Sequence, residues 1–334
     1  MPEGLTLSLV AVVVLAVVFD YINGFHDSAN AIATSVATRA LSPRAAVLMA
    51  AAFNFIGAFA GTAVATTIGS GLVDESTTTE AVVAAALVGA ILWNLFTWWF
   101  GIPSSSSHAL IGGLLGATIV SAGFGALDVD GIVSKVLVPM FSSPVLGFAL
   151  GFLLMVLLAH LFFRARRRPM SRLFRRAQVF SAGYMAFAHG SNDAQKTMGI
   201  ITLALFAAGV IDDIHVPAWV IVMAATAMSL GTAAGGWRIM KTMGQRVVKL
   251  EPVHGFAAET TAATVLLSTA QLGMPVSTTH VISSAITGVG TTRGRRQVRW
   301  DVARRIVTAW IVTIPAAGLA GALVWLGLSA LDLA

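Results

Sequence analysis

Apolar stretches follow one another along almost the whole chain, separated only by short polar connections. Several approach the roughly 20 residues that a helix needs to cross the hydrocarbon core of a bilayer. No segment between them is polar enough to predict a separate water-soluble domain. This pattern predicts an all-α integral membrane protein. The stretches are 5–22, 45–68, 81–100, 108–122, 136–163, 179–189, 197–211, 216–237, 257–272, 281–291 and 303–330.

Composition supports the same conclusion. Hydrophobic residues make up 57% of the 334 residues, charged residues make up 11%, and the mean hydropathy is +0.83. Soluble domains carry about 25% charged residues, so a soluble enzyme, a DNA-binding protein and a disordered scaffold are all disfavoured. The absence of cysteine excludes disulfides, iron–sulfur clusters and thiolate metal sites. Residues 1–4 (MPEG) lack the basic start of a signal peptide, which predicts that the first apolar stretch is a retained helix.

The formal charge of +6 comes from basic blocks that lie between apolar stretches. Segment 164–176 carries seven arginines and segment 293–305 carries six, whereas 70–80 and 210–217 are acidic. Basic connections are typical of the cytoplasmic side of a membrane. We therefore expect a multi-pass protein of the cell (inner) membrane with both termini outside. We expect no nucleic-acid partner, because the basic residues are not spread over one face.

Two short motifs recur in the same order in the two halves of the chain. Residues 102–108 (IPSSSSH) match 274–280 (MPVSTTH) without gaps, at an offset of 172. Residues 24–30 (GFHDSAN) match 190–196 (GSNDAQK) more loosely. Two pairs in the same order predict an internal duplication.

The charge of the connections predicts that the two halves cross the membrane in opposite directions. The stretch 45–68 runs from a basic to an acidic connection, and its counterpart 216–237 runs from an acidic to a basic one. Inverted-topology repeats with interrupted helices are a common plan of secondary transporters. The predicted parts are a first inverted repeat at 1–163, a basic cytoplasmic linker at 164–178 and a second inverted repeat at 179–334.

The first acidic motif places polar side chains directly against an apolar helix. Asn23, Asp27 and Asn30 are spaced i, i+4 and i+7, on one helical face. Gly24 predicts a local break that would free backbone carbonyls. Carboxylate, amide and carbonyl oxygens at such a break suit a small hard cation, or a proton on the carboxylate. Capping of a loop at the membrane surface is the alternative, but residues 189–193 repeat the pattern and charges inside a span are usually functional.

The second motif predicts a helix that begins with a proline and a run of hydroxyl side chains. Pro103 precedes four serines, and Pro275 precedes 277–279 (STT) after one intervening valine. Such a helix N-terminus attracts anions through its free N–H groups and its dipole. Two re-entrant helical hairpins, at 81–122 and 257–291, would place two such N-termini face to face around a tetrahedral oxyanion. Simple helix capping with packing of small residues is the alternative.

Three further residues have more than one interpretation. Glu259 lies inside an apolar stretch, and its counterpart at the offset of 172 is Leu87, so this charge has no match in the first half. We expect a coupling role for Glu259, with snorkelling to the membrane surface as the alternative. His108 and His280 either orient the hairpin tips, carry protons or are structural. A serine next to a histidine in a duplicated capping motif does not describe a catalytic dyad, so we expect no enzymatic activity.

Four segments in order resemble the inorganic phosphate transporter (PiT) family: 24–31 (GFHDSANA), 189–193 (HGSND), 235–244 (GGWRIMKTMG) and 275–280 (PVSTTH). This resemblance covers nearly the whole chain. It implies symport of phosphate with Na⁺ or H⁺ and no cofactor beyond the coupling ion. The hydroxyl residues that would bind phosphate are Ser105, Ser106, Ser107, Ser277, Thr278 and Thr279. The residues assigned to ion coupling are His26, Asp27, Asn30, Asn192, Asp193, Lys196 and Glu259.

The coupling ion is predicted from one position. Many sodium-coupled members of that family have asparagine where this chain has His26, and the histidine form resembles the bacterial low-affinity, proton-coupled group. That group is also similar in accepting neutral metal–phosphate complexes. We therefore favour H⁺, and with Na⁺ the metal ligands would be Asp27 and Asp193. The expected partners are phosphate, the coupling cation and the lipid bilayer, and a homodimer is left open.

Two other functions compete with phosphate symport. A sulfate permease of the same fold is the nearest, because hydroxyl and amide groups bind both oxyanions. An inverted-repeat cation exchanger would use the acidic motifs but leave the hydroxyl motifs without a role.

Overall fold

The computed structural model describes residues 6–333, so the prediction about residues 1–4 lies outside the described range. Within that range, one isolated bridge between Val73 and Leu127 is the only strand-like pairing. The α-helices are α1 (Leu7–Ala37), α2 (Pro43–Gly57), α3 (Ala63–Ser70), α4 (Glu80–Phe100), α5 (Ser106–Ala122), α6 (Val129–Gly131), α7 (Val138–Leu161), α8 (Arg167–Ala207), α9 (Ala218–Ala234), α10 (Trp237–Lys241), α11 (Pro252–Gln271), α12 (Thr278–Thr291) and α13 (Trp300–Ala330). Shorter 3-10 or π turns lie at Glu75–Thr77, Phe124–Ala126, Ile132–Leu137, Thr242–Arg246 and Arg295–Gln297.

Four helices among the described residues are long and apolar enough to cross a membrane: α1, α4, α13 and the continuous segment Val129–Leu161 that contains α7. The pair α9 and α10, bent by 58°, would add a fifth if it forms one broken span. Large apolar side chains are exposed along the outer helices, and Phe141 and Ile311 are 65% and 63% exposed. Apolar exposure of this extent requires a lipid surface rather than water. The chain is a membrane protein, as its composition predicts.

The predicted break at Gly24 is wrong, because α1 continues without interruption from Leu7 to Ala37. A Cβ atom on Gly24 would lie 2.3 Å from the carbonyl oxygen of Met228, so this glycine serves close packing against α9. The second acidic motif is also inside an unbroken helix, since α8 joins the stretches 179–189 and 197–211. Most of segment 164–178 forms the first turns of the same helix.

Two helix pairs carry the hydroxyl motifs. The helices α4 and α5 pack together and are joined by residues 101–105, and α11 and α12 pack together and are joined by residues 272–277. Gly101 and Gly273 open the two connections in the left-handed conformation, with φ of 64° and 66°. These two glycines are separated by 172 residues, which is the offset of the sequence motif. Each pair therefore turns back on itself at matching positions.

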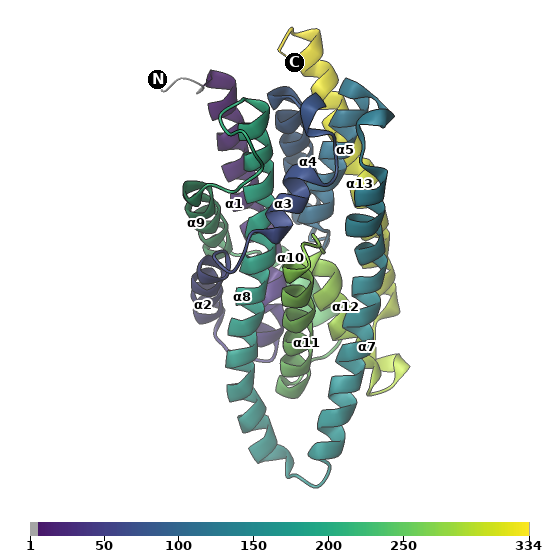
Figure 1. Cartoon of the computed structure of the whole chain (residues 1–334). Helices are drawn as coiled ribbons and strands as arrows, with labels where there is room; N and C mark the ends of the chain where they lie inside the picture. The colour runs from purple at the N-terminus through teal and green to yellow at the C-terminus, as the bar shows by residue number, and fades with distance from the viewer. Residues whose placement is uncertain (1–5, 334) are drawn as a thin grey trace.

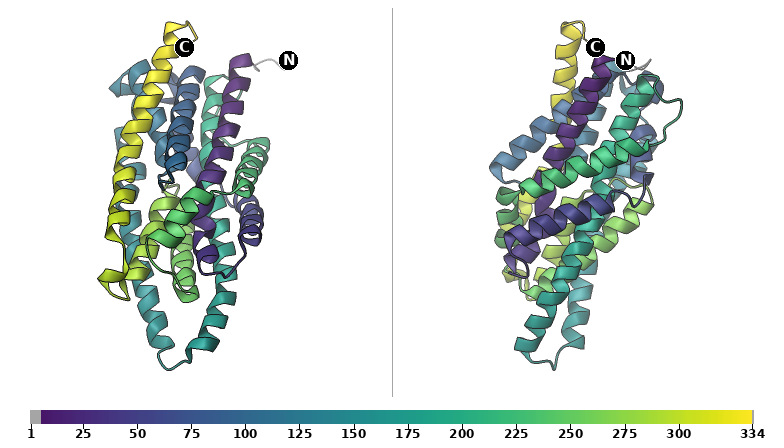
Figure 2. Two further views of the ribbon diagram at one scale, coloured as in Figure 1. Left: turned by 180° about the vertical axis from the view of Figure 1, so that it is seen from behind. Right: turned by 90° about the vertical axis from the view of Figure 1, so that its left-hand side faces the viewer.

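The inner helix of each pair is covered by a long helix from the other half of the chain. The helix α13 packs along α5, and α7 packs along α12. Small residues bring the backbones together, because a Cβ atom on Gly116 would lie 2.0 Å from the Gly318 carbonyl oxygen and one on Gly288 would lie 2.1 Å from that of Phe148. Such contacts are typical of helix packing in membranes. Figure 2 shows α13, in yellow, reaching the end of the molecule that holds the C-terminus, whereas α7, in teal, reaches toward the opposite end.

The two ends of the molecule differ in charge. Both termini lie at one end, and the connection between α7 and α8 lies at the other (Figure 1). That connection leads into the arginine-rich segment 164–176. A hydrogen bond of 3.3 Å between Thr6 and Glu80 places the start of α4, and the acidic connection before it, at the end with the termini. The separation of basic and acidic connections is the one that the charge pattern predicts.

Candidate functional site

The two acidic motifs lie inside the molecule on neighbouring helices, α1 and α8. The side chains assigned to coupling are buried: Asp27 is 3% exposed, and Asp193 is fully enclosed. Charged groups this deep need a partner, because removing a charge from water costs several kcal/mol per ion. The partners of the two carboxylates therefore show what each motif can do.

Asp27 is paired with a histidine. The Nδ1 atom of His26 lies 2.8 Å from the Asp27 Oδ1 atom, and its Nε2 atom lies 3.0 Å from the hydroxyl oxygen of Thr97 on α4. The Ser104 hydroxyl donates to Thr97 at 2.8 Å. A polar chain thus runs from the Asp27 carboxylate to the tip between α4 and α5.

Asp193 is paired with a lysine. Its Oδ1 atom accepts hydrogen bonds from the Lys196 ammonium, from the Thr278 hydroxyl at 2.9 Å and from the Asn192 amide at 2.9 Å. Lys196 stands where the first motif has Asn30. The two motifs are therefore alike in sequence but different in charge, because only the second contains its own fixed cation.

The other oxygen of Asp193 faces an atom that also accepts hydrogen bonds. The His189 Nδ1 atom donates to the Asn54 amide oxygen at 3.2 Å, and the Asn54 amide nitrogen donates to Thr232. In neutral histidine this arrangement leaves the Nε2 lone pair directed toward Asp193 Oδ2, 3.3 Å away. Two acceptors at this distance repel each other unless a proton or a cation lies between them.

Asp27 joins His189 and Asp193 in a group of three side chains that could hold a metal ion. One ligand atom each from Asp27, His189 and Asp193 lies within 4.8 Å of the others, and all three side chains are buried. The amide oxygens of Asn30 and Asn192 are buried without a hydrogen-bond partner. Carboxylate and amide oxygens suit a hard cation such as Na⁺, and the imidazole suits a proton. The geometry accommodates either.

The hydroxyl motifs form helix N-termini, as predicted. Ser105 caps α5 by accepting a hydrogen bond from the His108 N–H at 3.2 Å, and Ser277 caps α12 by accepting one from the His280 N–H at 3.2 Å. The other four predicted hydroxyl residues occupy the first turns and are at most 2% exposed. They are Ser106, Ser107, Thr278 and Thr279. The caps leave the first-turn N–H groups and hydroxyls as the candidate donors to an anion.

Both helix tips reach the acidic motifs. The Ser106 hydroxyl lies 3.5 Å from His26 Nδ1, and the Thr279 hydroxyl lies 3.5 Å from Asp27 Oδ1. The Asn30 amide donates to Thr279 at 2.9 Å. The structure thus brings the predicted oxyanion donors and the predicted coupling residues into one cluster.

The two tip histidines also meet. The rings of His108 and His280 are 4.7 Å apart edge to face, and the His280 ring stacks on Trp310 at 4.0 Å. These contacts join α5 to α12 and α13. Of the roles considered from sequence, orienting the tips is the one that this geometry supports.

Glu259 is separate from this cluster. It is buried on α11 and accepts hydrogen bonds from Thr34 at 2.5 Å, from Gln178 at 3.1 Å and from Ser181. Thr34 follows Asp27 by seven residues on α1, which is about 10 Å along the helix axis. Glu259 therefore makes no direct contact with the other residues assigned to coupling. Its hydrogen-bond network forms a second buried acidic site.

A model of the phosphate transporter family matches residues 23–321. The chain belongs to this family. Over 94% of its length it is 49% identical to a probable low-affinity inorganic phosphate transporter of Rhizobium meliloti, of which it covers 95%. Over 96% of its length it is 45% identical to the protein described in the same words from Bacillus subtilis, of which it covers 97%. These relatives are transporters, which confirms the expectation that the chain is not an enzyme.

The fold matches that of a solved structure. The structure entitled "The sodium-dependent phosphate transporter" superposes with a TM-score of 0.89 and covers 97% of this chain and all of its own, at 24% sequence identity. At this identity the likeness establishes the all-helical transporter fold.

Several residues of these two networks were not predicted from the sequence. They are Thr97 of the central cluster and Gln178 and Ser181 of the Glu259 network. Each lies in an unremarkable helical stretch and meets its partner only through the fold. Asn54 gave a signal that could have been used, since it is a lone amide within the apolar stretch 45–68.

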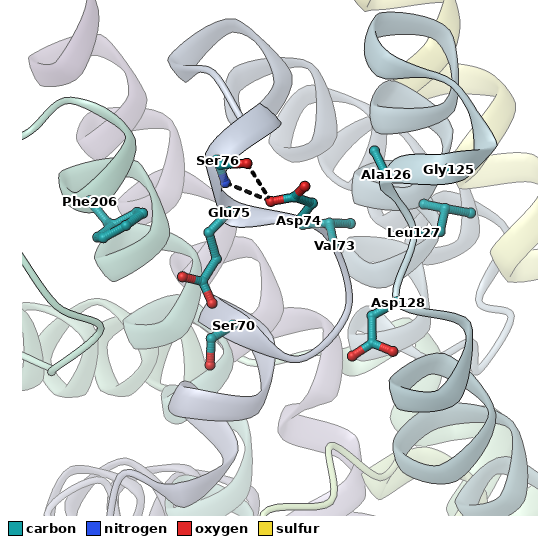
Figure 3. A pocket seen from close by; sticks show the side chains of 10 residues that line it. All are labelled: Ser70, Val73, Asp74, Glu75, Ser76, Gly125, Ala126, Leu127, Asp128 and Phe206. Carbon is teal, nitrogen blue, oxygen red and sulfur yellow. Dashed lines mark hydrogen bonds between the residues drawn. The ribbon is translucent and has the colours of Figure 1, made fainter.

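A surface pocket of about 400 Å³ lies away from this family site (Figure 3). Asp74, Glu75 and Asp128 line it, together with Phe206. Hydrogen bonds from Ser76 hold the pKa of Asp74 below its ordinary value, whereas burial raises the pKa of Glu75. An acidic lining of this kind does not favour a phosphate anion, so we assign the pocket no role in substrate binding.

Proposed function

We propose that the protein is a symporter that imports inorganic phosphate together with a proton. The observation that carries this proposal is that two hydroxyl-capped helix N-termini meet at the acidic motifs. The start of α12 reaches Asp193 and Asp27 through its threonine hydroxyls, and the start of α5 reaches His26, the partner of Asp27, through Ser106. Helix N-termini and hydroxyls donate to oxyanions without adding a full positive charge. Phosphate would bind between the tips, with donors from Ser105, Ser106, Ser107, Ser277, Thr278 and Thr279.

Charge balance explains why such a site must be coupled. With both histidines neutral, Asp27 and Asp193 contribute two negative charges and Lys196 contributes one positive charge. A phosphate anion would make this buried site more negative still, and uncompensated charge is costly away from water. Phosphate must therefore enter with protons or cations, or as a neutral metal–phosphate complex. A neutral metal–phosphate complex is thus the second form of substrate that we propose for the site.

The histidines favour the proton. His26 contacts Asp27 directly, and His189 directs a ring nitrogen at Asp193. Imidazole accepts a proton near neutral pH, whereas it coordinates Na⁺ poorly. Asp27, Asp193 and Glu259 would carry the protons, with His26 assisting, and Na⁺ would be held by Asp27 and Asp193 if it were the ion.

The two halves would act as inverted repeats in the inner membrane. In this arrangement α4–α5 and α11–α12 are re-entrant hairpins that enter from opposite sides, with both chain termini outside. The matched left-handed glycines and the exchange of covering helices α7 and α13 support a duplicated architecture. A homodimer is left open.

Uptake of labelled phosphate by proteoliposomes tests the function. We expect an inward acid gradient without sodium to drive accumulation, and Asp27→Asn to abolish it. Sulfate and arsenate serve as competitors, because the same donors could bind either oxyanion. Accumulation that requires a sodium gradient and ignores pH would contradict proton coupling. Stronger transport of sulfate than of phosphate would identify a sulfate permease instead.

A further inference from the structure

A further buried acidic group lies outside both the central cluster and the Glu259 network. Asp20 is on α1, seven residues before Asp27 and on the same helical face, and it is fully buried. Neither of its carboxylate oxygens accepts a hydrogen bond of ordinary geometry. In this respect it differs from Asp27, Asp193 and Glu259, each of which has a charged or hydrogen-bonding partner at short range.

The polar neighbours of Asp20 also lack partners. Asn23 and Thr197 lie beside the carboxylate. Their contacts to Asp20 are loose, because both polar atoms of Asn23 and the hydroxyl of Thr197 are buried without a hydrogen bond of ordinary geometry. Buried polar atoms in folded proteins are nearly always paired. Several loosely paired polar atoms at one place therefore mark a position where a proton or an ion would complete the hydrogen bonding.

Asn94 of α4 belongs to the same level. The helices α1 and α4 run side by side in the same direction, because Thr6 contacts Glu80 near their starts and His26 contacts Thr97 further along. Asn23 precedes His26 by three positions, and Asn94 precedes Thr97 by three positions. Both asparagines therefore lie on the same helix faces as these two residues, one turn nearer the chain termini. Asn94 is fully buried, and both of its polar atoms are unpaired.

No net positive charge compensates Asp20. The charged groups that act on it are Asp193 and Lys196 of α8, which have opposite signs and are bonded to each other. The helix α9, which also packs on α1, carries no titratable residue, and the only one on α4 is Glu80 at its first turn. A bare carboxylate here would be an uncompensated buried charge, so the group must hold a proton or a bound cation.

We propose that Asp20, with Asn23, Asn94 and Thr197, forms a proton-binding site separate from the phosphate site, and that its proton crosses the membrane with each substrate. The carboxylate takes up H⁺ from water on the outer side to give the neutral carboxylic acid, whose O–H donates to one of the amide oxygens. On the inner side the acid returns H⁺ to water. This inference rests on the proposed proton symport and adds one carrier to it.

Thermodynamics gives the size of the expected effect. A gradient of one pH unit supports about tenfold accumulation for each coupled proton. Asp20→Asn is isosteric and neutral, like the protonated acid, so it should retain phosphate–phosphate exchange across the membrane. Its accumulation ratio under one pH unit should fall by about tenfold, that is by one proton. Asp20→Glu should restore part of the loss, and Asp212→Asn, at an exposed position, should match the wild type.

Two readouts separate this inference from the proposed function. If the wild type shows no accumulation driven by pH, proton symport itself fails; if Asp20→Asn keeps the full accumulation ratio, only the assignment of Asp20 fails. Infrared difference spectra should contain carbonyl bands of buried protonated carboxyl groups, and Asp20→Asn should lose one component while those of Asp27, Asp193 and Glu259 remain. Spectra unchanged by Asp20→Asn would overturn the proposal. Transport that depends on sodium in the wild type but not in Asp20→Asn would also overturn the proposal, because Asp20 would then bind Na⁺ rather than a proton.

A second variant guards against misfolding of the first. If Asp20→Asn does not exchange phosphate, Thr197→Val removes a neighbouring hydroxyl at nearly constant volume and leaves the carboxyl group in place. We expect exchange to continue and the pH of half-maximal uptake to move. An unchanged pH profile in an active Thr197→Val protein would overturn the proposal.

Discussion

At the scale of single residues, one substitution makes the two acidic motifs unequal. Asn30 in the first motif corresponds to Lys196 in the second. The Lys196 ammonium is bonded to Asp193, and both side chains are buried. Asp193 therefore has a permanent counter-charge, whereas Asp27 depends on the protonation of His26 or on an incoming cation. The exchangeable charge of the central cluster is thus concentrated on the α1 side.

The Lys196–Asp193 pair should be sensitive to loss of one partner. Lys196→Gln leaves a buried carboxylate without its cation, and breaking a buried pair in this way costs about 3–5 kcal/mol. The double variant Lys196→Gln/Asp193→Asn removes both charges and should recover much of that loss. Thermal unfolding in detergent, followed by circular dichroism, measures the difference. A single variant as stable as the wild type would show that Asp193 does not need the lysine.

The hydroxyls at the helix tips should contribute directly to phosphate affinity. Ser106→Ala and Thr278→Ala each remove a donor to a partly dehydrated oxyanion, and a hydrogen bond to a charged group contributes about 1.5–3 kcal/mol, or about 10- to 150-fold in affinity. The concentration dependence of phosphate uptake measures this change. Thr308→Ala, an exposed hydroxyl on α13, is the control. Unchanged kinetics in both tip variants would mean that the tips only cap their helices.

At the scale of helices, the sequence predicts where a helix begins and how long its apolar stretch is. It predicts less well whether a helix continues unbroken through a polar motif. The starts of α5 and α12 follow local rules, since Ser105 and Ser277 each accept a hydrogen bond from a free N–H group of the first turn. The continuity of α1 through Gly24 could not be predicted, because it depends on a close approach to Met228. The contact between Thr34 and Glu259 is equally hidden, since it joins residues separated by 225 positions.

The packing of α5 on α13 gives a test at this scale. A Cβ atom on Gly116 would lie 2.0 Å from the Gly318 carbonyl oxygen. Gly116→Ala should therefore force the helices apart at a cost of about 1–3 kcal/mol, and should disturb the tip that α5 carries at its start. Gly327→Ala on α13 is the matched control, because its Cβ atom would meet nothing within 4 Å. Thermal stability and phosphate uptake should fall in the first variant only.

At the scale of the whole molecule, the arrangement of charge connects the fold with its setting. Figure 1 places both termini at one end and the α7–α8 connection at the other. The sequence alone predicts this separation, because membrane orientation depends on arginine and lysine counts in short connections rather than on tertiary contacts. The central cluster could be predicted only in part, since its motifs are local but their meeting requires both halves of the chain.

Orientation in the membrane can be tested with single cysteines, because the chain contains none of its own. Arg168 and Asp74 are both exposed, and they lie in the arginine-rich segment and in the acidic connection before α4. We expect a membrane-impermeant maleimide to label Asp74→Cys on intact cells, and to label Arg168→Cys only after permeabilisation. External labelling of Arg168→Cys together with protection of Asp74→Cys would invert the orientation. Labelling of both from one side would contradict their placement at opposite ends. Because inward transport requires phosphate to enter from the outer side, this assignment also fixes the face from which the acid gradient must act.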